Sequence, residues 1–98
     1  MNGPKVIILA ELIVDLGFLD EVKAAAKKSV ALALQEPGIE LFKLTYNPMY
    51  PNCLYFFEVY TSKAAHDAHL QTPHAQEFFA FSKGKMLNPS KLTHLSEF

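Results

Sequence analysis

Two stretches of this chain are apolar at nearly every position, which constrains the fold more than any other feature. Residues 5–14 (KVIILAELIV) and 53–61 (CLYFFEVYT) are rich in the aliphatic and aromatic residues that favour strands. A sheet with one face in water alternates apolar and polar residues along each strand. Neither stretch alternates, so both faces of the sheet have to be covered. In the first stretch the two sides would be Val6, Ile8, Ala10 and Leu12, and Ile7, Leu9 and Ile13.

The rest of the chain follows helical and extended patterns in turn. Residues 18–35 carry apolar side chains at helical spacing, and the Pro-Gly pair that follows ends the pattern. Two further helices are predicted, at 63–70 and from Pro73 to about residue 86. The other predicted strands are 39–46 and 89–98, and a turn-rich loop at 47–52 makes a hairpin of the two middle strands. The predicted apolar face of the first helix is Phe18, Val22, Ala26, Val30, Ala33 and Leu34.

The order β-α-β-β-α-β predicts an α+β fold of the ferredoxin-like, split βαβ kind. This arrangement has an antiparallel sheet with its helices on one face, and the 98 residues are expected to form a single domain, 1–98. The helices can cover only one of the two apolar faces. We therefore expect a homodimer in which two copies pack sheet to sheet.

Composition narrows the classes of partner. Nine lysines, no arginine and ten acidic residues give a net charge of −1 without a basic run, which argues against nucleic acid as a partner. The single cysteine, Cys53, cannot form an internal disulfide and suits a reducing cytoplasm. The apolar N-terminal stretch is too short to span a membrane and is interrupted by Glu11 and Asp15. We expect a cytoplasmic protein without a membrane partner.

Three polar residues in apolar surroundings are candidates for catalysis. Glu58 lies inside a strand, where a carboxylate is either a hydrogen-bonded structural anchor or part of a site. His69 and His74 flank the Thr72-Pro73 junction, and the turn of the chain there would direct both imidazoles into one space. His74 would lie in the first turn of a helix, where the helix dipole favours the neutral ring that a general base needs.

Two features near these histidines have alternative interpretations. Phe78 and Phe81 share a helical face with His74, and Phe79 and Met86 lie nearby; this stripe is either plain core or the wall of a cavity. His66, His69 and His74 have a weak resemblance to a metal cluster, but no cysteine or neighbouring acid completes a ligand set. We expect no metal there, and we expect His66 to be a solvated helix residue.

Several motifs together resemble one family. They are Glu36-Pro37-Gly38, Glu58-Val59-Tyr60, and Ala68-His69 followed by Thr72-Pro73-His74. In these the chain resembles the antibiotic biosynthesis monooxygenase family, which includes quinol monooxygenases and an isomerase of a quorum-sensing sugar phosphate. The resemblance covers nearly the whole chain. It implies a dimeric α+β barrel with a pocket between the helices and the sheet of each subunit.

The resemblance also implies a chemistry. Several members oxidise phenols or quinols with molecular oxygen and use neither metal nor flavin, so no cofactor is expected and the partner would be a small aromatic substrate. In that scheme His69 or His74 is the base, Glu58 orients an imidazole, and Tyr60 donates a hydrogen bond to a substrate oxygen. The substrate-binding residues implied are Tyr60, Phe42, Phe78, Phe81 and Met86.

Some residues depart from the family's variants. The first strand has no Asn and the chain has no Trp, which argues against haem degradation, and Ala75 stands where an aromatic residue often follows the histidine. The absence of arginine weakens the sugar-phosphate reading. Two alternatives stay open: an isomerase or lyase that uses the same base on a small carbonyl compound, and a non-catalytic dimer that binds a small molecule.

Overall fold

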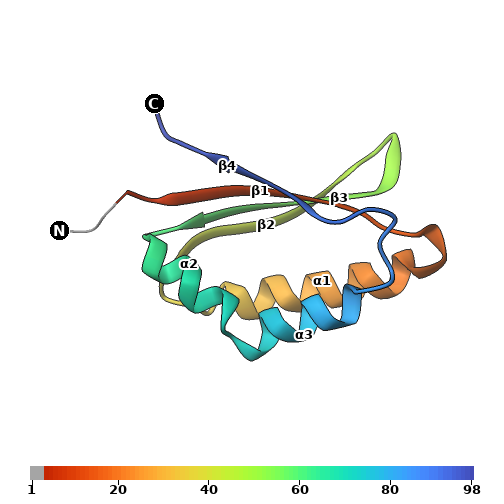
Figure 1. Ribbon diagram of the computed structural model, residues 1–98, viewed down its shortest axis with the longest axis horizontal. Coiled ribbons are helices and arrows are strands. Elements are labelled where there is room, and N and C mark those ends of the chain that lie inside the picture. The colour runs from red at the N-terminus through yellow and green to blue at the C-terminus, as the bar shows by residue number, and fades with distance from the viewer. Residues whose placement is uncertain (1–3) are drawn as a thin grey trace.

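A four-stranded antiparallel sheet carries all the helices on one of its faces (Figure 1). The computed structural model describes residues 4–98, and the sheet order is β2-β3-β1-β4. This topology confirms the predicted α+β, ferredoxin-like fold. The elements are β1 (Val6–Ile13), a 3₁₀ turn (Leu16–Phe18), α1 (Leu19–Ala33), β2 (Ile39–Asn47), β3 (Tyr50–Tyr60), α2 (Lys63–Leu70), α3 (Pro73–Ser82) and β4 (Lys91–Leu95).

The core lies between the sheet and the helices. The strands contribute alternate residues to it, and α1 contributes one stripe of small and branched side chains at helical spacing. Phe18 and Leu34 do not belong to that stripe, and their assignment to it was wrong. They flank the helical turns of α1 and are 37% and 54% exposed. The fully buried strand and helix residues include Ile8, Leu54, Tyr60 and Val22.

The opposite face of the sheet is apolar as well. Leu9 of β1 pairs with Phe57 of β3, and Ile7 pairs with Val59, all on the side away from the helices. No segment of residues 4–98 lies over this outer face (Figure 1). The apolar side chains there shield one another only partly, and Leu41 at the edge is 40% exposed.

Several element boundaries differ from the sequence-based expectation. Helix α3 ends at Ser82 and not near residue 86, because Lys83 is extended (ψ 129°) and Gly84 takes the left-handed φ of 82° that favours glycine. Met86 then pairs with Val14 as an isolated bridge. Strand β4 is shorter than predicted, at Lys91–Leu95.

The predicted hairpin between β2 and β3 is confirmed, but its loop is shorter than the expected 47–52. Strand β3 already begins at Tyr50, which pairs with Asn47. Between that pair and Tyr46–Leu54 the register shifts, so residues 51–53 form a bulge relative to β2, while Cys53 still pairs with Ile13 of β1. A bulge tolerates Pro51, whose missing N–H would disrupt a regular ladder.

No helix in residues 4–98 has the length and apolar character needed to cross a membrane.

Candidate functional site

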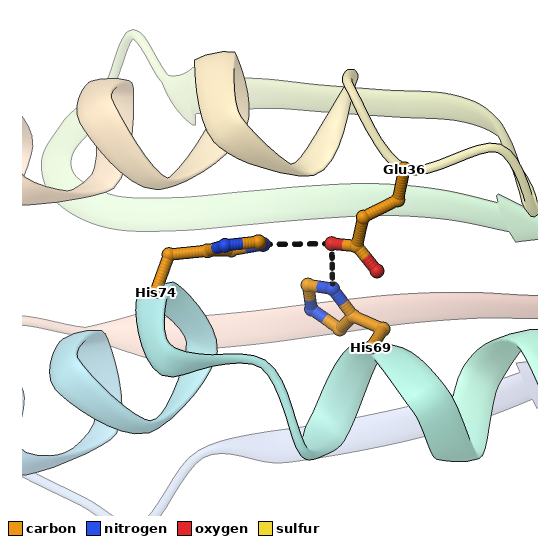
Figure 2. Close-up of side chains that lie close together, drawn as sticks. All are labelled: Glu36, His69 and His74. Atoms are coloured by element: carbon orange, nitrogen blue, oxygen red, sulfur yellow. Dashed lines mark hydrogen bonds and ion pairs between the residues drawn. The ribbon is translucent and has the colours of Figure 1, made fainter.

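The carboxylate of Glu36 binds both histidines of the Thr-Pro junction (Figure 2). Its Oε2 lies 2.8 Å from Nδ1 of His69 and 2.7 Å from Nε2 of His74. The three residues come from the turn after α1, the last turn of α2 and the first turn of α3. All three side chains are largely buried, with exposures of 15%, 6% and 16% in that order of elements. Two segments that are distant in sequence therefore meet in one cluster.

The hydrogen bonds define which ring nitrogens carry protons. An ionised carboxylate only accepts hydrogen bonds, so His69 donates through Nδ1 and His74 donates through Nε2. In neutral His69 the lone pair is then on Nε2, which makes no hydrogen bond to residues 4–98. Among those residues every fully buried side-chain nitrogen or oxygen has a partner, so this Nε2 retains accessible surface. His69 thus has a positioned ring with one free basic nitrogen.

The break between the two histidines is stabilised by Thr72. Its Oγ1 accepts a hydrogen bond from the Ala75 amide (3.2 Å) and donates one to the His69 carbonyl (2.7 Å). Pro73 occupies the start of α3, where its missing N–H costs nothing. One hydroxyl thus connects the end of α2 to the beginning of α3, which directs the rings of His69 and His74 toward Glu36, with their centroids 5.8 Å apart.

Replacing Thr72 by alanine should lower the free energy of unfolding by about 1 kcal/mol, because the N-terminus of α3 loses its cap. Urea unfolding monitored by circular dichroism measures the change. Thr72→Ser is the matched control and should remain close to the parent, since it keeps the hydroxyl. Equal losses in both variants would assign the effect to the methyl group and contradict the capping role.

Glu36 reaches the histidines because its turn lies against α2. A Cβ atom on Gly38 would lie 2.5 Å from the Cβ of Ala65, far inside van der Waals contact. The Gly38 carbonyl also accepts a hydrogen bond from the Thr61 amide (2.9 Å). The φ of Gly38 is not in the left-handed region, so its backbone conformation does not require glycine. Glycine is needed here because the turn approaches α2 so closely. The turn and α2 are thereby held at the separation that the Glu36–His69 bond requires.

Gly38→Ala should therefore destabilise the fold by roughly 1–3 kcal/mol, the range for an added group in a packed site. The double variant Gly38→Ala/Ala65→Gly removes the clashing methyl on α2. It should recover most of that loss, apart from the roughly 1 kcal/mol that glycine costs inside a helix. Denaturant unfolding of the four proteins in this cycle gives the coupling. Purely additive losses would rule out the contact as the cause.

A cavity of about 240 Å³ lies between the helices and the sheet. It exceeds the ~150 Å³ apolar cavity that accommodates a benzene ring in another protein. His69, Glu58 and His66 are its titratable lining residues. Its apolar walls are Ile8, Ala10, Leu12, Phe42, Phe56 and Phe78, with Leu70 and Leu92 among the residues at its rim. A single aromatic ring with small substituents fits this space and chemistry.

Glu58 lines the cavity, but its partner is not a histidine. The hydroxyl of Tyr60 donates to Glu58 Oε1 at 2.5 Å. Burial raises the pKa of Glu58 to about 7, and the hydrogen bond from Tyr60 only partly opposes this shift. Burial and the adjacent Glu58 charge raise the pKa of Tyr60. The expectation that Glu58 orients an imidazole was wrong, since Glu36 occupies that position.

The raised pKa of Glu58 makes stability depend on pH. Between its ordinary value of 4.5 and about 7, the folded protein holds a proton that the unfolded chain has lost. The free energy of unfolding should therefore fall by roughly 3 kcal/mol as pH rises through this window. Glu58→Gln should lack this component. Burial lowers the pKa of His66, which makes the free energy of unfolding rise with pH. This contribution is common to both proteins and cancels in their difference. Urea unfolding of both proteins at about pH 5 and about pH 8 measures the effect. An equal change in the free energy of unfolding for the parent and Glu58→Gln would contradict the assignment.

The other predicted substrate-binding residues divide between two places. Phe42 and Phe78 line the cavity. Tyr60 is fully buried behind Glu58 and does not line it. Phe81 borders a separate groove of about 210 Å³ between α1 and α3, and Met86 borders a shallow depression near the C-terminal segment. The assignment of these three to the cavity was wrong, because Tyr60 is buried in the core and Phe81 and Met86 border other depressions.

The groove and the cavity share a wall. Ser29 and Phe78 border both spaces, and His74 lies on the groove side while His69 lies on the cavity side. The Glu36 cluster thus bridges the two spaces through its two imidazoles. The expectation for His66 was also wrong: its ring packs 4.7 Å from that of Tyr60 and lines the cavity.

Sequence reasoning missed the role of Glu36, although Glu36-Pro37-Gly38 was part of the family resemblance. The absence of a nearby acid was inferred from local spacing alone. Glu36 is 33 residues from His69 and 38 from His74 along the chain, so no spacing rule finds it. The Pro-Gly pair after it was the available signal, since such a pair predicts a tight turn whose preceding side chain is held in place.

Comparison with known proteins places this geometry in context. The family model for antibiotic biosynthesis monooxygenase matches residues 5–80, which include the Glu36 cluster and Glu58. No curated protein sequence matches the chain.

Solved structures share the fold. A Nitrosomonas europaea protein superposes with a TM-score of 0.92 at 18% identity, covering 99% of this chain and 93% of its own. Rv0793 from Mycobacterium tuberculosis superposes with a TM-score of 0.90 at 21% identity, covering 96% of this chain and 95% of its own. A Lactobacillus acidophilus protein gives 0.89 at 29% identity, covering 94% of this chain but 44% of its own. Because the family model matches most of this chain, residues 5–80, the chain belongs to the antibiotic biosynthesis monooxygenase family.

Proposed function

We propose that this protein is a cofactor-independent monooxygenase that oxidises a small phenol or quinol with molecular oxygen. The observation that carries the proposal is the free Nε2 of His69, which belongs to a ring positioned by Glu36 in an aromatic-lined cavity. A base, a largely apolar pocket and a partner for the second substrate oxygen are what this chemistry requires. Membership of the family supports the same reading.

His69 begins the reaction by removing the phenolic proton. Glu36 stabilises the resulting imidazolium through Nδ1, as an acidic residue paired with a catalytic histidine does. The phenolate passes one electron to O₂, and the phenoxyl radical and superoxide combine at a hydrogen-bearing carbon ortho or para to the phenolic oxygen, forming a C–O bond. His69 returns its proton to the distal oxygen. Loss of the proton from that carbon and cleavage of O–O then release water, so a phenol and O₂ give a quinone and H₂O, and a hydroquinone and O₂ give a hydroxyquinone and H₂O.

Glu58 is suited to the second oxygen of the substrate. With a pKa of about 7, it is present in both protonation states near neutral pH. Its Oε1 accepts from Tyr60, so a proton on the other oxygen is available to donate to a ligand. We assign Glu58 as the proton donor to the second oxygen of a quinol or quinone in the cavity.

An oxygen electrode and mass spectrometry test the proposal. Phenols and hydroquinones are screened with chelator-treated protein, and products are analysed after reaction under ¹⁸O₂. One O₂ should be consumed per quinone formed, with one ¹⁸O atom in the product. Activity that persists after chelation and without added flavin or haem fits the proposal. Activity that returns only with a metal or flavin would overturn it.

A second candidate is an isomerase or lyase for a small carbonyl compound. The observation that favours it is the presence of two proton-transfer groups, His69 and Glu58, in one cavity. Such a pair moves a proton between two carbons without oxygen. Turnover of a carbonyl compound in D₂O, with deuterium incorporated and no oxygen consumed, would select this reaction over the oxygenase.

We also propose that the protein functions as a homodimer in the cytoplasm. The uncovered outer face of the sheet is apolar at the centre of both middle strands, through Leu9 and Phe57. A second copy presents the same face, so the two surfaces match in character across a two-fold axis. Cytoplasmic conditions keep a lone thiol such as Cys53 reduced.

A further inference from the structure

The Glu36 cluster has a second chemical capacity besides orienting a base. One ligand atom from each of Glu36, His69 and His74 lies within 4.8 Å of the other two (Figure 2). Two imidazole nitrogens and a carboxylate oxygen form a ligand set typical of borderline divalent transition metals. The side chains are 6–16% exposed and are already held together, so little ordering is needed to bind an ion.

We propose that these three atoms bind one divalent transition-metal ion of the Zn²⁺ class, and that binding switches off the base. In a tetrahedral site with bonds of about 2.0–2.1 Å, ligand atoms lie about 3.3 Å apart. The present oxygen–nitrogen distances are 2.7 and 2.8 Å. Each oxygen–nitrogen distance therefore has to lengthen by about half an ångström, and the two ring nitrogens, which lie within 4.8 Å of each other, have to approach to about 3.3 Å as the hydrogen bonds are replaced by bonds to the metal. Water completes the coordination.

The identity of the ligand atoms determines the effect on His69. The metal takes the lone pair of Nδ1, the nitrogen that otherwise donates to Glu36. In the neutral ring the proton then resides on Nε2, which becomes a donor and no longer accepts a proton from a substrate. His74 changes tautomer in the same way, from Nε2–H to Nδ1–H. Metal binding and base catalysis thus exclude each other; this regulatory part rests on the proposed function, whereas the binding part does not.

Hard cations are poor occupants of this site. Ca²⁺ and Mg²⁺ prefer six or more oxygen ligands, and the cluster offers one carboxylate with two nitrogens. We expect selectivity for Zn²⁺ over Mg²⁺, which gives an internal negative control for every measurement.

Titration of tag-free, chelator-treated protein tests the binding. Isothermal titration calorimetry with Zn²⁺ should give one ion per chain, and Co²⁺ should give the intense visible absorption of a tetrahedral site. His74→Ala and Glu36→Gln should each weaken binding at least 10-fold. His94→Ala is the matched control, because that ring faces His66 at 6.5 Å, outside the cluster. Absence of binding, or binding weakened only by His94→Ala, would overturn the site.

The tautomer and the activity are then measured separately. In ¹⁵N-resolved histidine spectra, Zn²⁺ should move the His69 proton from Nδ1 to Nε2, whether or not a substrate is known. Saturating Zn²⁺ should abolish oxygen consumption by the parent protein, and the activity that His74→Ala retains should resist it. Zn²⁺ bound with full activity would overturn the switch. If no phenol is oxidised under any condition, the proposed function fails while the binding and tautomer results still decide the metal site.

Discussion

Replacing His69 by asparagine should lower turnover of a phenolic substrate by about 10²–10⁴-fold, the usual contribution of a general base. The amide nitrogen of asparagine can take the place of Nδ1 and still donate to Glu36, but nothing basic remains where Nε2 lies. Asparagine is preferable to alanine because the His69 side chain is buried and its ring packs 5.3 Å from that of Phe42.

Initial rates of oxygen consumption, with urea unfolding of the same samples, measure this effect. His94→Asn is the matched control, since that histidine is exposed on β4 and does not line the cavity. Glu36→Gln should give a smaller loss, because an amide still orients the ring but does not neutralise the imidazolium. His69→Asn with parental turnover would exclude His69 as the base and shift attention to Glu58.

Replacing Leu9 by lysine should abolish the proposed dimer and yield aggregated or unfolded protein. Leu9 lies at the centre of the outer face of the sheet, opposite Phe57 and Thr93. We expect the proposed interface to bury on the order of 2,000 Å² or more, as obligate dimers do. An unpaired ammonium there would lose its hydration, and an uncovered apolar face of that size is not soluble.

Analytical ultracentrifugation at micromolar concentration measures this outcome. Leu34→Lys makes the same chemical change at the end of α1, where the leucine is 54% exposed, and should leave the dimer intact. A parent protein that sediments as a compact monomer would refute the dimer. A soluble, folded Leu9→Lys dimer would show that the two copies meet elsewhere.

Much of the fold was predictable because burial has a period that the sequence records directly. Strands with apolar residues at successive positions predicted a two-sided sheet, and the structure has an apolar outer face as well as a helix-covered one. Element ends were less predictable. The early stop of α3 depends on the backbone at Gly84, and the early start of β3 depends on a bulge that accommodates Pro51. Both depend on how the backbone fits against neighbouring strands, and the periodicity of apolar residues contains no information about that fit.

At the candidate site, the sequence alone determined that His69 and His74 come together, because a Thr cap and a Pro at the first helical position define the turn between them. It also marked Glu58 as unusual, since a carboxylate inside an apolar strand is costly. Only the tertiary structure decided which acid serves the histidines. Glu36 reaches them because Gly38 lets its turn pack against Ala65, and that contact between distant segments depends on the shapes of two packed elements. Glu58 instead meets Tyr60, two residues away on the same side of its own strand, because successive side chains of a strand point to opposite faces.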